Sequence, residues 1–97
     1  MKREENKQTL GQAIQKMISD LGMEEKILSV KAEELFVEMM GNYIMKHVKS
    51  VAVNKRVLYL KISTPELKHE LMYGKSKIIQ HINSEIGKEY ILDVKFQ

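Results

Sequence analysis

The sequence has no cysteine, no tryptophan and a single proline among its 97 residues. Without cysteine the chain has no disulfide framework, no thiolate metal ligand and no cysteine nucleophile, so a reducing compartment suits it. No run approaches the roughly 18 apolar residues of a membrane span, and the N-terminal residues are polar and unlike a signal peptide. We therefore expect a cytoplasmic protein that neither enters nor crosses a membrane.

Length and composition predict one folded domain. Hydrophobic residues make up 43% of the chain and charged residues 30%, which is ordinary for a globular protein. A chain of this length buries only about two thirds of its unfolded surface, so its core is small. Because the chain is long enough for one domain only, an enzyme with a cleft between two domains is excluded. We expect residues 1–8 to form a flexible leader and residues 9–97 to form the domain.

Two helices are expected in the first half of the chain. Thr9 begins a capping box, and the apolar stripe that follows it ends before Gly22, which stands where a helix C-terminus favours positive φ. A second helix begins near Glu24. Its apolar face widens between Leu35 and Val48, and Gly41-Asn42 marks a place where this helix would kink or end.

A hairpin, one long helix and a last strand are expected to follow. Ser50–Val53 and Arg56–Ile62 are rich in β-branched and aromatic residues, which predicts two strands joined by a turn with Asn54 at positive φ. Ser63–Glu66 opens a helix of about 22 residues, long enough to cover a three-stranded sheet. Tyr90–Phe96 alternates apolar residues as a strand with one buried face does.

The expected fold is therefore an α+β, two-layer domain with the element order α-α-β-β-α-β. The last strand can lie parallel to one hairpin strand through a right-handed crossover. This arrangement gives a three-stranded mixed sheet covered by helices.

Positive charge is concentrated in the middle of the chain. Between Met39 and His81 eight basic residues stand against two acidic ones. This excess predicts a surface that contacts nucleic-acid phosphates, while a merely solvated surface is the equal alternative. With two Phe, four Tyr and no aromatic pair on a strand, base stacking is not expected to be the main binding mode. The eight residues are Lys46, Lys49, Lys55, Arg56, Lys61, Lys68, Lys75 and Lys77.

No pattern supports a catalytic, metal or cofactor site. Gly74-Lys75-Ser76 resembles the end of a phosphate-binding loop, but His69 stands where that loop requires an earlier glycine. The tripeptide also lies inside the expected helix. We expect Gly74 to allow close packing there. Glu66 and His69 are one helical turn apart but supply fewer ligands than zinc takes. His47 and His81 have no visible nucleophile and carboxylate partners. We expect no enzyme, no metal and no cofactor.

Three methionines leave two interpretations open. Met39, Met40 and Met45 lie in the widened apolar segment. They are either plain core or an adaptable surface for a protein partner or a second copy of the chain.

Several blocks of the sequence match a known family from Leu10 onward. Leu35–His47 is similar to W-x-x-V-V-G-x-x-I-x-x-H, Val57–Leu71 to L-x-V-x-V-x-S-P-x-L-x-x-E-L, and Ile79–Gly87 with Ile91–Phe96 to L-N-x-x-x-G and I-x-x-I-x-F. The chain thus resembles the short, single-domain members of the DciA-like family, bacterial proteins associated with the replicative helicase.

The resemblance implies a KH-like domain, DNA binding and a role as a helicase loader or operator that does not hydrolyse ATP. Three departures from the family pattern matter. The first is Phe36, which stands in place of the usual Trp and is a conservative core change. The second is the missing long tail through which larger members engage helicase. The third is the absence of the G-x-x-G motif with which standard KH domains grip nucleic acid. DNA contact would then depend on the basic surface, and the absent tail puts contact with the replicative helicase in doubt.

We therefore expect a non-enzymatic DNA-binding accessory protein, single- or double-stranded DNA being bound through its backbone. The alternative is a protein-interaction module or homodimer that uses the Met39–Met45 segment, without a direct role for nucleic acid.

Overall fold

The computed structural model describes residues 10–17 and 22–97. Residues 10–17 are helical, and the predicted cap at Thr9 and leader at 1–8 lie outside the described residues. Gly22 has φ +71°, the positive value that the sequence predicts at this position. The further elements are α2 (Glu24–Met45), β1 (Val48–Asn54), β2 (Val57–Ile62), α3 (Pro65–Tyr73), α4 (Lys75–Ile86) and β3 (Asp93–Phe96).

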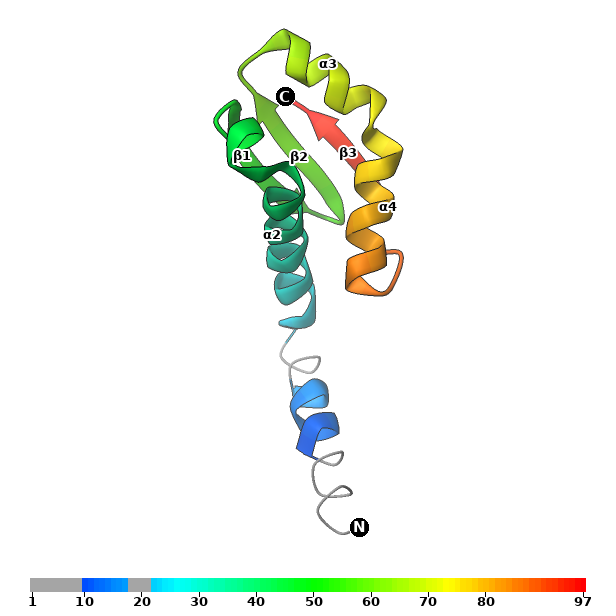
Figure 1. Cartoon of the computed structure of the whole chain (residues 1–97). Helices are drawn as coiled ribbons and strands as arrows, with labels where there is room; N and C mark the ends of the chain where they lie inside the picture. Colours follow the sequence, from blue (N-terminus) through cyan, green and yellow to red (C-terminus); the bar gives the residue numbers. More distant parts are fainter. Residues whose placement is uncertain (1–9, 18–21) are drawn as a thin grey trace.

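The three strands form one mixed sheet in the order β1-β2-β3. β1 is antiparallel to β2, and β3 is parallel to β2, which confirms the hairpin and the predicted parallel pairing of the last strand with a hairpin strand. Helices α2 and α4 lie on the same side of the sheet (Figure 1). The expected α+β class with a three-stranded mixed sheet is confirmed.

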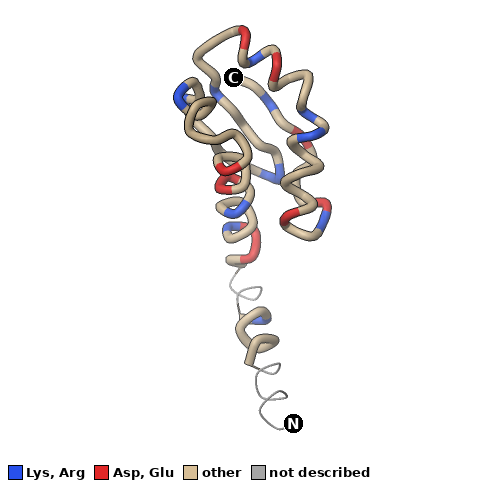
Figure 2. Tube along the Cα trace, viewed as in Figure 1, with Lys and Arg blue, Asp and Glu red and all other residues tan. Residues whose placement is uncertain are grey.

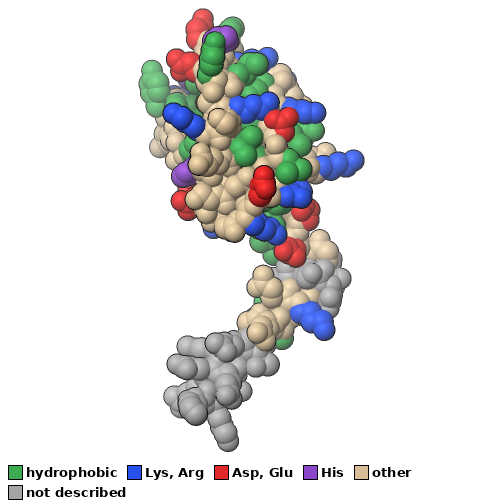
Figure 3. Space-filling model, turned by 90° about the vertical axis from the view of Figure 1, so that its right-hand side faces the viewer, with side chains coloured by type: hydrophobic (Ala, Val, Ile, Leu, Met, Phe, Trp, Pro, Cys, Tyr) green, Lys and Arg blue, Asp and Glu red, His purple; other side chains and the backbone are tan. Residues whose placement is uncertain are grey.

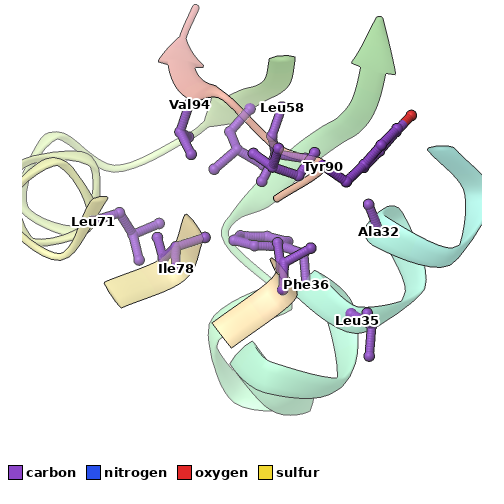
Figure 4. Close-up of a cluster of buried hydrophobic side chains, with 11 residues drawn as sticks. Ala32, Leu35, Phe36, Leu58, Leu71, Ile78, Tyr90 and Val94 are labelled. Carbon is purple, nitrogen blue, oxygen red and sulfur yellow. The ribbon is translucent and has the colours of Figure 1, made fainter. Parts of the chain in front are cut away.

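The core lies between these helices and the sheet. Phe36 of α2 and Ile82 of α4 pack into one cluster with Leu58 of β2 and Val94 of β3, and all four are 0% exposed (Figure 4). Phe36 is thus a core residue, which agrees with its interpretation as a conservative replacement of Trp.

The prediction of one long helix after the hairpin is wrong. Gly74, with φ −87° and ψ 10°, separates α3 from α4, so the order contains two helices where one was expected. The break lets α3 pack on β2 while α4 packs on β3 and α2, and the change of direction is visible in Figure 1. A Cβ at Gly74 would meet only backbone oxygens at 3.7 and 3.9 Å, which is ordinary contact, so the close-packing role predicted for Gly74 is also wrong.

The hairpin turn lies one residue later than predicted. Lys55 and Arg56 have positive φ, at 50° and 66°, as both central residues of a type I′ turn do. Asn54 instead pairs with Val57 as the last residue of β1. The Arg56 side chain donates hydrogen bonds to the carbonyls of Tyr90 and Glu89, and these bonds offset the strain of a left-handed arginine.

The approach to β3 also differs from the predicted alternation. Tyr90 and Ile91 are both buried, whereas Leu92 is 56% exposed. The cause is Asn83 of α4, whose carboxamide oxygen accepts hydrogen bonds from the backbone N–H groups of residues 90 and 91 at 3.1 and 2.7 Å. This anchoring fixes the segment in a non-strand conformation, and regular pairing begins at Asp93.

Helix α2 kinks at the predicted position. Gly41 has φ 79° and ψ 168°, a region open essentially only to glycine, and helical structure continues to Met45. The kink turns the end of the helix toward the start of β1.

Candidate nucleic-acid interface

One face of the sheet packs on the helices and the opposite face does not. In β2, Leu58 and Leu60 are buried while Lys61 is exposed, so Tyr59 and Lys61 point away from the core. The same alternation applies to β1 and β3, whose valines pack on the core. We call the opposite side the outer sheet face, made of Ser50, Ala52, Asn54, Val57, Tyr59, Lys61, Asp93 and Lys95.

Tyr59 lies in the middle of the outer sheet face. The register places it between Ala52 of β1 and Lys95 of β3, and Ser50 stands opposite Lys61. The two β1 residues are small, so the tyrosine ring has little beside it on that side. Tyr59 is half-buried, which leaves part of its ring open to solvent.

The single acidic residue of the outer sheet face is neutralised. The Lys75 ammonium lies 2.8 Å from Oδ1 of Asp93, and both side chains are about two-fifths exposed. The hydrogen bond from Lys75, followed by the hydrogen bond from the Val94 N–H, holds the pKa of the Asp93 carboxyl below its ordinary value of 3.8. Because Asp93 stays ionised and is paired with Lys75, Lys61 and Lys95 supply the net positive charge of this face.

The other predicted basic residues are spread over several elements and do not form one patch. Lys46 ends α2, and Lys49 lies exposed beside Ser50 at the irregularity of β1. Lys68 is on α3 and Lys77 on α4. Figure 2 shows the basic positions distributed along the trace, and the side seen in Figure 3 carries Lys and Arg side chains interspersed with acidic ones.

Lys55 and Arg56 lie at the far end of the sheet from Lys61. They are separated from it by the length of β2, roughly 20 Å. The Arg56 Nε donates to the Tyr90 carbonyl at 2.9 Å, and the guanidinium carbon lies 5.8 Å from the centre of the Tyr90 ring. Arg56 therefore has a structural role at the hairpin turn, while contact with phosphate stays a prediction.

Tyr90 links this turn to the start of α2. Its hydroxyl donates a hydrogen bond to Oε1 of Glu25 at 2.8 Å. Burial, followed by this hydrogen bond to a carboxylate, raises the pKa of Tyr90. The neighbouring cavity, about 420 Å³ in volume, carries both Arg56 and Lys88 and the acids Glu24 and Glu25, so its charges largely cancel. It does not favour a ligand of either sign.

The methionines and histidines lie apart from the outer sheet face. Met39, Met40 and Met45 are partly buried and pack against the core, so their use by a partner stays a prediction. The His69 ring contacts Tyr73 edge-on, with centroids 5.0 Å apart. Within residues 10–17 and 22–97 no three His, Asp or Glu side chains are grouped as metal ligands, and no helix there is long and apolar enough to cross a membrane.

Sequence reasoning missed two residues of this face. Lys95 lies outside the central basic segment, and Tyr59 was not singled out, because no aromatic pair stands on a strand. The alternation of Val94, Lys95 and Phe96 already placed Lys95 opposite the core. Knowledge of the register between β2 and β3 was needed to bring it beside Tyr59.

Comparison with known proteins identifies one family. Residues 9–96 match the sequence profile described as Dna[CI] antecedent, DciA, which covers almost the whole chain. No curated protein and no solved structure matches. The KH-like description of the fold therefore stays a prediction.

Proposed function

The chain belongs to the DciA family, and from this premise we propose that it binds DNA through the outer sheet face as a non-enzymatic accessory protein. Membership points to a role of the replicative-helicase-loader type in bacterial DNA replication, with helicase as the protein partner. The order α2-β1-β2-α3/α4-β3, with the last helix broken in two, supports the KH-like description. A cytoplasmic location follows from this role.

The observation that carries the proposal is the composition of the outer sheet face. Lys61 and Lys95 flank a partly exposed Tyr59, and Lys75 neutralises the one acid. Lysine ammonium groups bind phosphates as point charges without reading base sequence. Of the eight basic residues predicted from the sequence, Lys61 belongs to this face, Lys75 reaches it through Asp93, and Lys49 lies at its margin. The remaining five lie outside this face, and their contact with phosphates is a separate prediction: Lys46, Lys55, Arg56, Lys68 and Lys77.

Two details favour a role without nucleotide hydrolysis. The Gly74 N–H donates to the Glu70 carbonyl at 3.0 Å, so it is not free to hold a phosphate. Lys75 is paired with Asp93 rather than directed at a loop. This arrangement supports the interpretation of Gly74-Lys75-Ser76 as a helix junction.

The proposal is tested by fluorescence anisotropy of labelled DNA with Lys61→Ala/Lys95→Ala. We expect affinity for single- and double-stranded DNA to fall at least about tenfold, and the log-log salt slope on single strands to flatten by about 0.7 for each phosphate that the variant no longer binds. Lys16→Ala/Lys88→Ala, which removes two exposed lysines outside the outer sheet face, is the matched control. Equal affinity of the double variant and the control would overturn the proposal.

The hairpin turn needs a separate test because Arg56 also holds the structure. Lys55→Ala removes charge without touching the Arg56 contacts, and we expect it to weaken binding to all sequences alike. Replacing both Lys55 and Arg56 should do so more strongly, with circular dichroism to confirm the fold. A loss of affinity confined to one DNA sequence would contradict contact through the backbone.

The second candidate is a protein-interaction module. The observation that favours it is not the methionine segment, which packs on the core, but the exposed apolar residues of α2. These residues lie on the helical side of the sheet and leave the outer sheet face free.

A further inference from the structure

Helix α2 has a second apolar face that nothing in the described part of the chain covers. Its four members are each between 42% and 48% exposed. Their spacing of four, three and seven residues places them on one side of the helix, away from Phe36 and the core. We call this set the α2 stripe: Met23, Ile27, Val30 and Val37.

Three of the four members of the α2 stripe are placed symmetrically about Val30, whereas Ile27 has Glu33 at the equivalent position on the other side. Met23 and Val37 stand seven positions before and after it. Lys26 and Glu34 stand four positions before and after it, and both are exposed. Apolar residues thus stand at equal distances on either side of Val30, and so do two opposite charges. Such a surface is complementary to its own copy turned by 180°.

We propose that the α2 stripe binds a second copy of this chain, with the two α2 helices antiparallel across a two-fold axis at Val30. Val30 then meets its counterpart, and Met23 of each copy meets Val37 of the other. The Lys26 ammonium of each copy approaches the Glu34 carboxylate of the other, so the interface holds two ion pairs. An interface in which the same patch is used by both copies closes at the dimer.

Two further observations support a second copy as the occupant. A shallow groove of about 310 Å³ lies on the stripe, lined by Lys26, Ile27, Val30, Lys31 and Glu34, and it can receive an apolar side chain of the facing helix. Neither Lys26 nor Glu34 forms an ion pair within residues 10–17 and 22–97. A partner of unrelated sequence would not require the charges to be placed symmetrically about Val30.

Charge reversal tests this dimer by sedimentation equilibrium of the full chain. In a dimer of Lys26→Glu, the new glutamate at position 26 of each copy faces Glu34 of the other copy. In a dimer of Glu34→Lys, the new lysine at position 34 of each copy faces Lys26 of the other copy. We expect each variant to raise the dimer Kd roughly tenfold or more. Lys26→Glu/Glu34→Lys restores both ion pairs with reversed polarity, so its Kd should return toward the value of the unchanged protein.

An equimolar mixture of the two single variants gives the sharpest result. Every Lys26→Glu chain then faces a Glu34→Lys chain with two correct ion pairs, so the mixture should form heterodimers while each variant alone stays monomeric. Lys77→Glu on α4 is the control, because this exposed lysine lies away from the stripe. All substituted positions are exposed, so the fold should be preserved.

Two results would overturn the proposal. The first is an unchanged protein that stays monomeric up to about millimolar concentration. The second is a dimer whose Kd is the same in both single variants and in Lys77→Glu. DNA binding through the outer sheet face is measured separately and does not depend on either result.

Discussion

Asn83 is the residue that joins the last helix to the last strand. Its carboxamide oxygen accepts hydrogen bonds from two backbone N–H groups, and its Nδ2 donates to the Ile91 carbonyl at 3.0 Å. Asn83→Ala leaves these backbone groups without partners, and we expect the free energy of unfolding to fall by about 2–3 kcal/mol in urea denaturation. Asn83→Asp is the matched variant because it keeps both acceptor bonds. A loss of stability as large in Asn83→Asp as in Asn83→Ala would contradict this account.

The Asp93 carboxyl gives the stability a dependence on acid pH. Its pKa is lower in the folded chain than the ordinary value of 3.8, so its contribution is complete above that value and is lost as the pH falls through the lowered pKa. We expect Asp93→Asn to be less stable than the unchanged protein at pH 7, with the difference shrinking as the pH falls below about 4. Thermal denaturation across this range measures it, and a difference independent of pH would refute the role of Lys75.

At the scale of elements, the junction between α3 and α4 tolerates a side chain. Gly74 has negative φ, and an added Cβ would make only ordinary contacts. Gly74→Ala should therefore leave the free energy of unfolding unchanged or raise it by about 0.4–1 kcal/mol, because alanine restricts the unfolded chain. Chemical denaturation measures this, and a clear loss of stability would show that the junction does need glycine.

The kink in α2 is expected to behave in the opposite way. Gly41 has φ 79° and ψ 168°, a region that an alanine occupies only with strain. Gly41→Ala should lower the free energy of unfolding by about 1–3 kcal/mol. The contrast with Gly74→Ala in the same denaturation assay is the informative result, and equal effects of the two substitutions would contradict the backbone argument.

The sequence predicted the elements and the kink in α2 better than the features that depend on distant contacts. Apolar spacing located α2, the hairpin strands and the parallel last strand, because burial of one face determines those patterns. It did not predict the break at Gly74 or the burial of both Tyr90 and Ile91. Those features come from contacts between distant residues, such as Asn83 with the chain before β3. Local periodicity does not reflect such contacts.

At the scale of the whole molecule, the sheet separates two surfaces with different uses. The outer sheet face has lysines around one tyrosine. The helices lie on the opposite side (Figure 1), and the α2 stripe is exposed there. The sequence located the excess of positive charge but not its distribution, because most of the predicted basic residues lie outside the face that the register assembles. A dimer through α2 would leave both outer sheet faces open to DNA.

The central claim, DNA binding through the outer sheet face, is tested most directly by mapping amide chemical shifts. The ¹⁵N-labelled protein would be titrated with a short single-stranded oligonucleotide and, separately, with a duplex. We predict that the largest changes fall on Tyr59, Lys61 and Lys95 and weaken as salt is raised. Changes confined to α2, or no change at low salt, would contradict the claim.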